Sequence, residues 1–181
     1  MAAVLGQRYA LAALEARYPA FTLVTQNVDD LHRRAGSRHL VALHGDIARS
    51  VCSVEGIEVR DWPADGPVPP RCPRCGAGLR PAVVWFGEGL PPEAIDAAFR
   101  AAETCEVFLC IGTSTIVYPA AELPFVAHRC HACVVEINTD DTPLSSIADY
   151  RLEGPAGTLL PALVAALAAA DAGAGTAELP R

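Results

Sequence analysis

Short apolar runs alternate with helix-like segments along this chain, and each run ends in small or polar residues. The runs are rich in β-branched and aromatic side chains, which predicts buried strands at residues 21–25, 40–43, 82–86, 106–111 and 133–137. Apolar residues at helical spacing predict helices at residues 2–18, 91–104, 119–129 and 159–170. Strands that alternate with helices are typical of an α/β fold with a parallel sheet.

One stretch interrupts this alternation. Residues 51–81 are rich in proline and glycine, contain three cysteines and show little periodicity, which indicates a small loop-rich insert. We therefore expect one Rossmann-like domain formed by residues 1–50 and 82–170, a zinc-ribbon-like insert at 51–81 and a flexible tail at 171–181. A total of 181 residues suits one domain with an insert.

The composition excludes several function classes. All 14 basic residues are arginine, so no Schiff-base or P-loop lysine is present. A net charge of −7 disfavours a nucleic-acid partner. The apolar run 159–170 is too short for a membrane span, and charges in the first helix argue against a signal peptide. We expect a cytoplasmic protein with no membrane partner, whose seven cysteines serve as metal ligands or core thiols.

Polar residues that follow three of the predicted strands are candidates for a site. Residues 25–29 (TQNVD) offer carboxamides and a carboxylate, although the same residues also suit a capped turn. His44 before Gly45 suits a general base, or is a satisfied polar side chain. Residues 112–114 (GTS) offer N–H groups and hydroxyls to a phosphate or ribose, but so short a motif is weak alone.

Two groups of cysteines allow metal or redox chemistry. Cys72 and Cys75 form a C-x-x-C-G knuckle, and Cys52 lies upstream with Glu55 where a second pair would have its second cysteine. Zinc accepts a carboxylate ligand, so a site of three cysteines and Glu55 is chemically sound, and loss of the metal is the alternative. Cys130 and Cys133 suit a redox pair, a second metal site or, more simply, core thiols.

The order of these motifs resembles the sirtuin family. The resemblance covers residues 8–168 and is carried by TQNVDDLH at 25–32, HG at 44–45, the cysteine insert, VVWFGE at 83–88, GTS at 112–114, YPAA at 118–121, IN at 137–138 and GPAG at 154–157. It implies an NAD-dependent protein-lysine deacylase that acts on acylated-lysine proteins or peptides. The acyl group moves to ADP-ribose and nicotinamide is released.

The resemblance also implies a role for individual residues. His44 would be the general base, and Asn27 and Asp29 would form the nicotinamide pocket and take part in catalysis. The remaining cofactor contacts implied are Gln26, Gly112, Thr113, Ser114, Asn138 and Ala156. The substrate contacts implied are Val84, Phe86, Gly87, Glu88 and Tyr118. The family's zinc is structural and remote from catalysis.

This sequence departs from the family pattern near its start. Sirtuins begin with a strand and a Gly-Ala-Gly loop that holds the pyrophosphate, whereas Gly6 is the only glycine before Gly36 here. We expect a parallel sheet that lacks its first, central strand. The explanations are a start recorded downstream of the true one, which we favour, a truncated remnant, or a short non-catalytic module that does not bind NAD productively. In the family, the residues that select acetyl or succinyl groups would lie in the N-terminal segment that is not found here.

Overall fold

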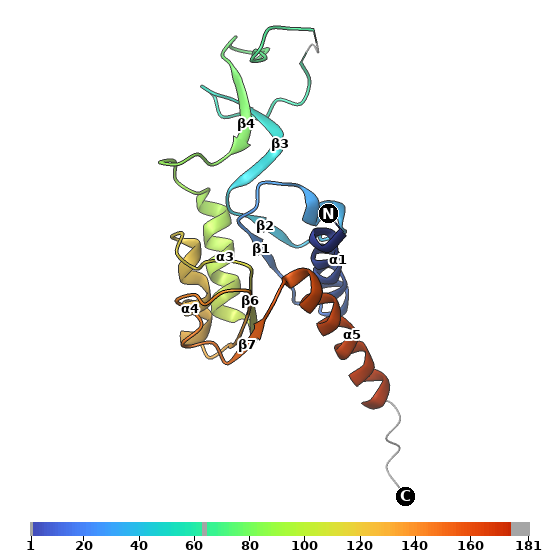
Figure 1. The fold of residues 1–181 in the computed structure, drawn as a ribbon. Coiled ribbons are helices and arrows are strands. Elements are labelled where there is room, and N and C mark those ends of the chain that lie inside the picture. The colour runs from blue at the N-terminus through green and yellow to red at the C-terminus, as the bar shows by residue number, and fades with distance from the viewer. Residues whose placement is uncertain (1, 63–64, 175–181) are drawn as a thin grey trace, which may run out of the picture.

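Two helical layers flank the strands of this protein. The computed structural model describes residues 2–62 and 65–174. Helices α1 (Ala2–Arg17) and α5 (Ala156–Ala174) lie on one side of the strands, and α3 (Pro92–Thr104) and α4 (Leu123–Arg129) lie on the other (Figure 1). No helix in these described ranges is long and apolar enough to cross a membrane.

The strands between the layers pair in parallel, as the alternation in the sequence predicts. β1 (Leu23–Thr25) pairs with β2 (Leu40–Ala42), with Val24 opposite Val41. β5 (Val107–Ile111) pairs with β6 (Cys133–Asn138), which pairs with β7 (Tyr150–Glu153). Since parallel strands end on the same edge of a sheet, the polar residues after β1, β2, β5 and β6 face one region of the molecule.

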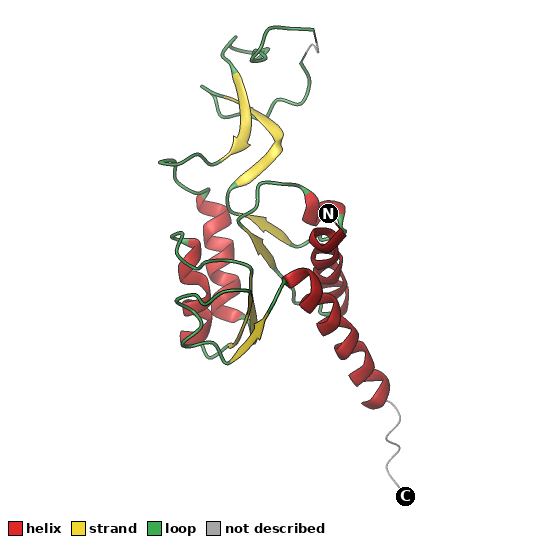
Figure 2. Ribbon diagram, in the orientation of Figure 1, coloured by secondary structure: helices red, strands yellow, loops and turns green. Residues whose placement is uncertain are grey.

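The insert is built on an antiparallel hairpin that projects from this body (Figure 2). β3 (Gly45–Cys52) pairs with β4 (Leu79–Val83), and the register shifts between Asp46 and Ser50. The sequence did not predict β3, and it placed the strand of β4 at 82–86. Both differences have one cause. Pairing with β3, and not the apolar run 82–86, determines where β4 begins and ends.

The helices differ from their predicted bounds in three places. A short helix, α2 (Leu31–Arg34), follows the TQNVD motif, and a 3₁₀ turn at Ala120–Glu122 precedes α4. Helix α5 begins earlier and ends later than the periodicity predicts, and Pro161 lies inside it. Pro161 is the sixth residue of α5, past the four N–H groups that have no partner within a helix, so it costs the helix one backbone hydrogen bond. Residues 171–174, expected in the tail, are the end of α5, and 175–181 lie outside the described residues.

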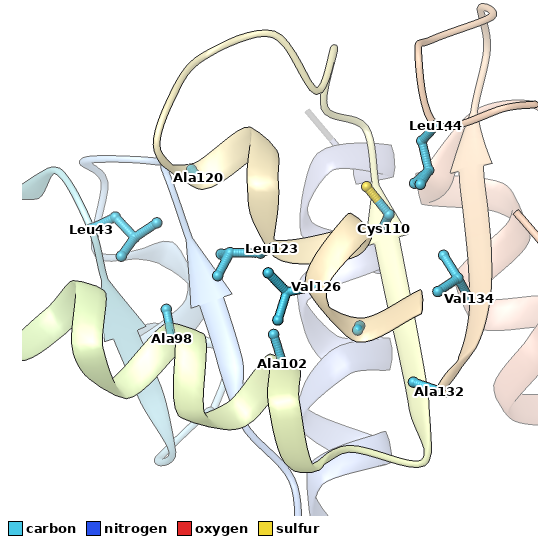
Figure 3. Packing of buried hydrophobic residues seen from close by; sticks show 11 residues of the cluster. Leu43, Ala98, Ala102, Cys110, Ala120, Leu123, Val126, Ala132, Val134 and Leu144 are labelled. Carbon is cyan, nitrogen blue, oxygen red and sulfur yellow. The ribbon is translucent and has the colours of Figure 1, made fainter. Parts of the chain in front are cut away.

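Each face of the central strands is covered by its own core. Towards α3 and α4, small and branched side chains interlock, among them Ala98, Ala102, Leu123, Val126 and Val134 (Figure 3). Towards α1 and α5 the buried residues are Ala10, Leu11, Leu14, Ile137 and Leu160. Burial on both faces explains why β5 reads as a continuous apolar run without alternation, and why β6 does so except at Glu136.

Candidate active site

Three polar residues from separate strands meet at the carboxyl ends of these strands. The amide of Gln26, after β1, donates to Thr113 Oγ1 at 3.4 Å. The amide of Asn138, at the end of β6, donates to the Thr113 carbonyl at 2.9 Å. The structure therefore brings together three residues that the sequence resemblance assigns to one cofactor.

The Gly112–Ser114 loop is open where it leaves β5. Gly112 has a positive φ of 59°, and nothing lies within 4 Å of the position where a Cβ would stand. Its N–H is held by the Ile137 carbonyl at 2.9 Å, which ties the loop to β6. Gly112 and Ser114 are exposed. The loop is thus anchored to β6 at Gly112, and its backbone and hydroxyl groups are accessible to a ligand.

A cavity of about 590 Å³ lies against these strand ends. Its walls include Val24 and Gln26 from the β1 side and Leu109 and Thr113 from the β5 side. Within the described residues, β1 pairs with β2 and β5 with β6, so the two walls are strands that do not pair with each other. This gap between β1 and β5 agrees with the expectation of a parallel sheet that lacks a strand, and polar side chains such as Gln26 and Thr113 line it beside the apolar ones.

His44 stands where β2 passes into the insert hairpin. Its Nδ1 is buried and has no hydrogen-bond partner among the described residues. Its carbonyl accepts the Val84 N–H at 3.0 Å, which connects the histidine directly to the segment after β4. The neighbouring Gly45 has φ of 81°, and a Cβ there would lie 2.0 Å from the Ala82 carbonyl oxygen. Glycine at 45 is what allows His44 and β4 to approach this closely.

The candidate substrate segment, residues 84–88, is exposed beyond this contact. Phe86 is fully exposed and Tyr118 is 69% exposed. Glu88 turns back on its own segment, where its carboxylate accepts the Trp85 N–H at 3.1 Å and pairs with Arg80 at 3.2 Å. Glu88 therefore shapes the loop in this structure, and Phe86 and Tyr118 provide apolar surface.

Asp29 and Asn27 lie at the turn between β1 and α2. The Thr25 hydroxyl accepts the Asn27 N–H at 3.1 Å, and Asp29 Oδ1 accepts the Leu31 N–H at 3.1 Å. The turn is thus capped, which was the simpler of the two interpretations of this motif. Asn27 also lines the cavity, so the capped turn and the functional interpretation are compatible.

Arg8 is a residue of this site that the sequence motifs did not identify. Its guanidinium Nη2 donates to Asp29 Oδ2 at 2.9 Å, and its side chain is only 4% exposed. One signal was available in the sequence. Arg8 stands one helical turn before the apolar Leu11, and a charged side chain on an apolar helix face needs a buried partner.

The insert gathers the four predicted metal ligands. One ligand atom from each of Cys52, Glu55, Cys72 and Cys75 lies within 4.8 Å of all the others. Cys52 Sγ and Cys75 Sγ are 3.4 Å apart, and the Glu55 N–H points at Cys52 Sγ. Hydrogen bonds from the backbone N–H groups of Glu55 and Val54 lower the pKa of Cys52. Three thiols and a carboxylate at this separation fit a tetrahedral zinc site.

Cys130 and Cys133 are not part of a comparable cluster. Both are free thiols; Cys130 is exposed and Cys133 is half-buried at the start of β6. In the described ranges, the insert cluster alone gathers three or more potential ligands. A second metal site at these cysteines therefore has no support.

Comparison with known proteins assigns this chain to a family. The model of the Sir2 family matches residues 5–119. The chain belongs to the Sir2 family. This confirms the resemblance to sirtuins seen in the motifs.

Individual relatives extend the match beyond residue 119. The chain is 49% identical over 167 residues to an NAD-dependent protein deacylase of Methylococcus capsulatus, covering 88% of this chain and 66% of the relative. It is 46% identical to an NAD-dependent protein deacylase of Aquifex aeolicus, covering 82% and 62%. This Sir2 chain thus spans a little under two thirds of the length of these relatives.

Solved Sir2 structures match the fold of this chain closely. The structure of a Sir2 homologue–NAD complex superposes with a TM-score of 0.84 at 44% identity, covering 91% of this chain and 65% of that one. A Sir2 protein bound to an acetylated peptide superposes with a TM-score of 0.83 at 29% identity, covering 90% and 70%. The predicted α/β architecture of parallel strands with an insert is confirmed.

Proposed function

We propose that this chain carries the site of an NAD-dependent protein-lysine deacylase. The observation that carries the proposal is the meeting of Gln26 and Asn138 at Thr113 by the strand ends, where Gln26 and Thr113 also line one cavity. Bound NAD would supply the ADP-ribose that accepts the acyl group, with release of nicotinamide. The names of the relatives, NAD-dependent protein deacylases, support this assignment.

We assign the cofactor contacts from the resemblance to sirtuins, and the positions of the residues support the assignment. Gln26, Asn138 and the loop Gly112–Ser114 would bind ribose and phosphate, since amides, hydroxyls and backbone N–H groups suit both. The amide of Asn27 and the carboxylate of Asp29 would bind the nicotinamide carboxamide. The backbone at Ala156, the first residue of α5, would meet the adenine. Gly154 N–H donates to the Asn138 carbonyl at 2.9 Å, which holds the chain before Ala156 next to Asn138.

His44 would act as the general base. A histidine is suited to accept a proton near neutral pH. Its Nδ1 is buried without a partner among the described residues, and its backbone is fixed to Val84. The backbone contact keeps the imidazole beside the substrate segment, where it would accept a proton from a ribose hydroxyl.

The acylated-lysine substrate would bind along residues 84–88. An extended peptide can add a strand to an exposed backbone edge, and its side chains then select pockets on either face. Val84 and Gly87 offer backbone groups in this segment, and Glu88 holds its shape. The exposed rings of Phe86 and Tyr118 would cover the apolar stem of the acyl-lysine. Acetyl and succinyl groups both fit this proposal. It includes neither a nucleic-acid nor a membrane partner.

The insert would hold a structural zinc ion through Cys52, Cys72, Cys75 and Glu55. Zinc there would join the two turns of the insert and would take no part in acyl transfer. A cytoplasmic location belongs to the same proposal. Seven free cysteines, three of them in a metal-type cluster, suit a reducing compartment.

The test is a deacylation assay with NAD and acetylated or succinylated peptides. The wild-type chain should release free lysine peptide only when NAD is present. His44→Ala should lower kcat by at least about 100-fold, the range of a lost general base. His128→Ala is the matched control, since His128 is an exposed histidine on α4, and it should retain wild-type turnover. A folded wild-type chain without NAD-dependent turnover would refute the proposal.

A further inference from the structure

The carboxylate of Asp29 is held at both of its oxygens. Oδ2 accepts the Arg8 guanidinium at 2.9 Å across the interface between α1 and the β1–α2 turn. Oδ1 accepts the backbone N–H of Leu31 at 3.1 Å. A carboxylate bound at one oxygen still rotates about its Cβ–Cγ bond, whereas one bound at both keeps a single orientation.

The ion pair between Arg8 and Asp29 differs from a surface salt bridge, because its cation is buried. The Arg8 side chain is 4% exposed and lines the cavity, whereas the Asp29 side chain is 39% exposed. The charge on Arg8 is therefore buried on the wall of the proposed cofactor site. Hydrogen bonds between ionised groups are stronger than those between neutral ones, and a buried arginine is costly without such a partner.

His32 completes the cluster as a neutral neighbour. It is buried, with 5% exposure, and lines the same cavity. Burial, followed by the positive charge of Arg8, lowers the pKa of His32, and Asp29 opposes this effect. Around neutral pH the cluster therefore consists of one cation, one anion and an uncharged imidazole.

The geometry points to Arg8 as a positioning residue for Asp29. Arg8 orients the carboxylate so that its remaining lone pairs face the nicotinamide carboxamide. This inference rests on the proposed function, because it takes Asp29 as the nicotinamide contact. A ligand that meets a preorganised acceptor does not have to order it on binding, so loss of Arg8 should weaken the nicotinamide half of the site selectively.

The test compares the two halves of the cofactor site in Arg8→Gln. The inhibition constant for nicotinamide should rise by about tenfold, the effect of one lost charge-assisted hydrogen bond. The Kd for ADP-ribose should stay within about twofold, because the change spares Thr113 and Asn138. Arg8→Lys, which keeps the charge, should recover part of the nicotinamide affinity. Arg17→Gln removes another arginine of α1 that pairs with an acid, Asp171, and should change neither constant.

A purely structural role would give a different result. Arg8→Gln would then lower Tm and weaken nicotinamide and ADP-ribose alike, or leave both unchanged, and either outcome overturns the inference. If Arg8→Gln does not fold, Arg8→Lys and Asp29→Asn carry the comparison. Asp29→Asn should weaken nicotinamide binding, and adding Arg8→Lys to it should have no further effect. If Arg8→Lys lowers the nicotinamide affinity of the Asp29→Asn variant further, Arg8 does not act through Asp29.

Failure of the proposed function would be recognised separately. Nicotinamide binding in the presence of ADP-ribose can be followed by saturation-transfer NMR without any acyl substrate. A wild-type chain that binds nicotinamide but transfers no acyl group would refute the deacylase proposal, and the comparison with Arg8→Gln would still decide the role of Arg8. A wild-type chain that does not bind nicotinamide would refute the inference about Arg8.

Discussion

Substitution of Gly45 by alanine should damage stability and the candidate site together. Gly45 has φ of 81°, and a Cβ there would meet the Ala82 carbonyl oxygen at 2.0 Å and its carbon at 3.0 Å. These are backbone atoms of β4, so no side-chain rotation relieves the clash. The strand would have to move away from the chain segment that carries His44.

The size of the effect follows from three contributions. A left-handed backbone costs a residue with a Cβ about 1–2 kcal/mol. Forcing β4 aside is an overpacking change that costs about 1–3 kcal/mol. The hydrogen bond from Val84 to the His44 carbonyl is worth about 1 kcal/mol and would be lost. We expect a total of about 4 kcal/mol, which lowers Tm by about 12 °C in a chain of this size.

Gly36→Ala separates backbone strain from the clash. Gly36 also has a positive φ, 106°, but a Cβ at this position would have the Ala12 methyl as its nearest neighbour at 3.8 Å, an ordinary contact. The substitution should lower Tm by about 4 °C, from strain alone. Thermal unfolding by circular dichroism measures both variants. Equal losses in Gly45→Ala and Gly36→Ala would refute the argument that Gly45 is required by the approach of β4.

Three further predictions test other parts of the molecule. Cys72→Ser should lower the zinc content from about one ion per chain to below about 0.1, measured by metal analysis, while Cys130→Ser should retain the ion; equal content in the two variants would contradict the proposed ligand set. Burial raises the pKa of Cys110 to about 12, and the charge of Glu136 adds to this, so Cys110 should resist alkylation at pH 8 until the protein unfolds; fast labelling in the native protein would contradict its burial. The folded pKa of His32 lies below its usual 6.5, so the free energy of unfolding should fall as the pH drops below about 6.5, and denaturant titrations should show a smaller fall in His32→Gln.

The sequence predicted the parts of the fold that depend on local burial. β5 and β6 are buried on both faces, so their apolar runs were visible without knowledge of their partners. β3 was missed because its middle residues are exposed and its pairing partner, β4, follows 27 residues later in the chain. The extent of α5 was underestimated because Pro161 looked like an interruption, whereas packing of Leu160 against the α1 side holds the helix through it.

The candidate site was predictable where chemistry and topology agree. Gln26, Thr113 and Asn138 each stand at or just after the end of an apolar strand, and strands that run in the same direction bring such residues to one end of the domain. Arg8 could not be assigned in the same way, because its function depends on a contact with Asp29, 21 residues away. Glu136, an acid in an apolar strand, could not be explained from the sequence for the same reason. It is 2% exposed, and its carboxylate accepts the Ser145 hydroxyl at 2.6 Å, a contact that only the fold reveals.

Our central proposal is that this chain transfers an acyl group from lysine to ADP-ribose derived from NAD. Mass spectrometry of a reaction containing the chain, NAD and an acetylated peptide tests this most directly. We expect deacetylated peptide, nicotinamide and acetylated ADP-ribose in equal amounts, and none of them with His44→Ala. Deacetylated peptide formed together with free acetate, or formed without NAD, would contradict it.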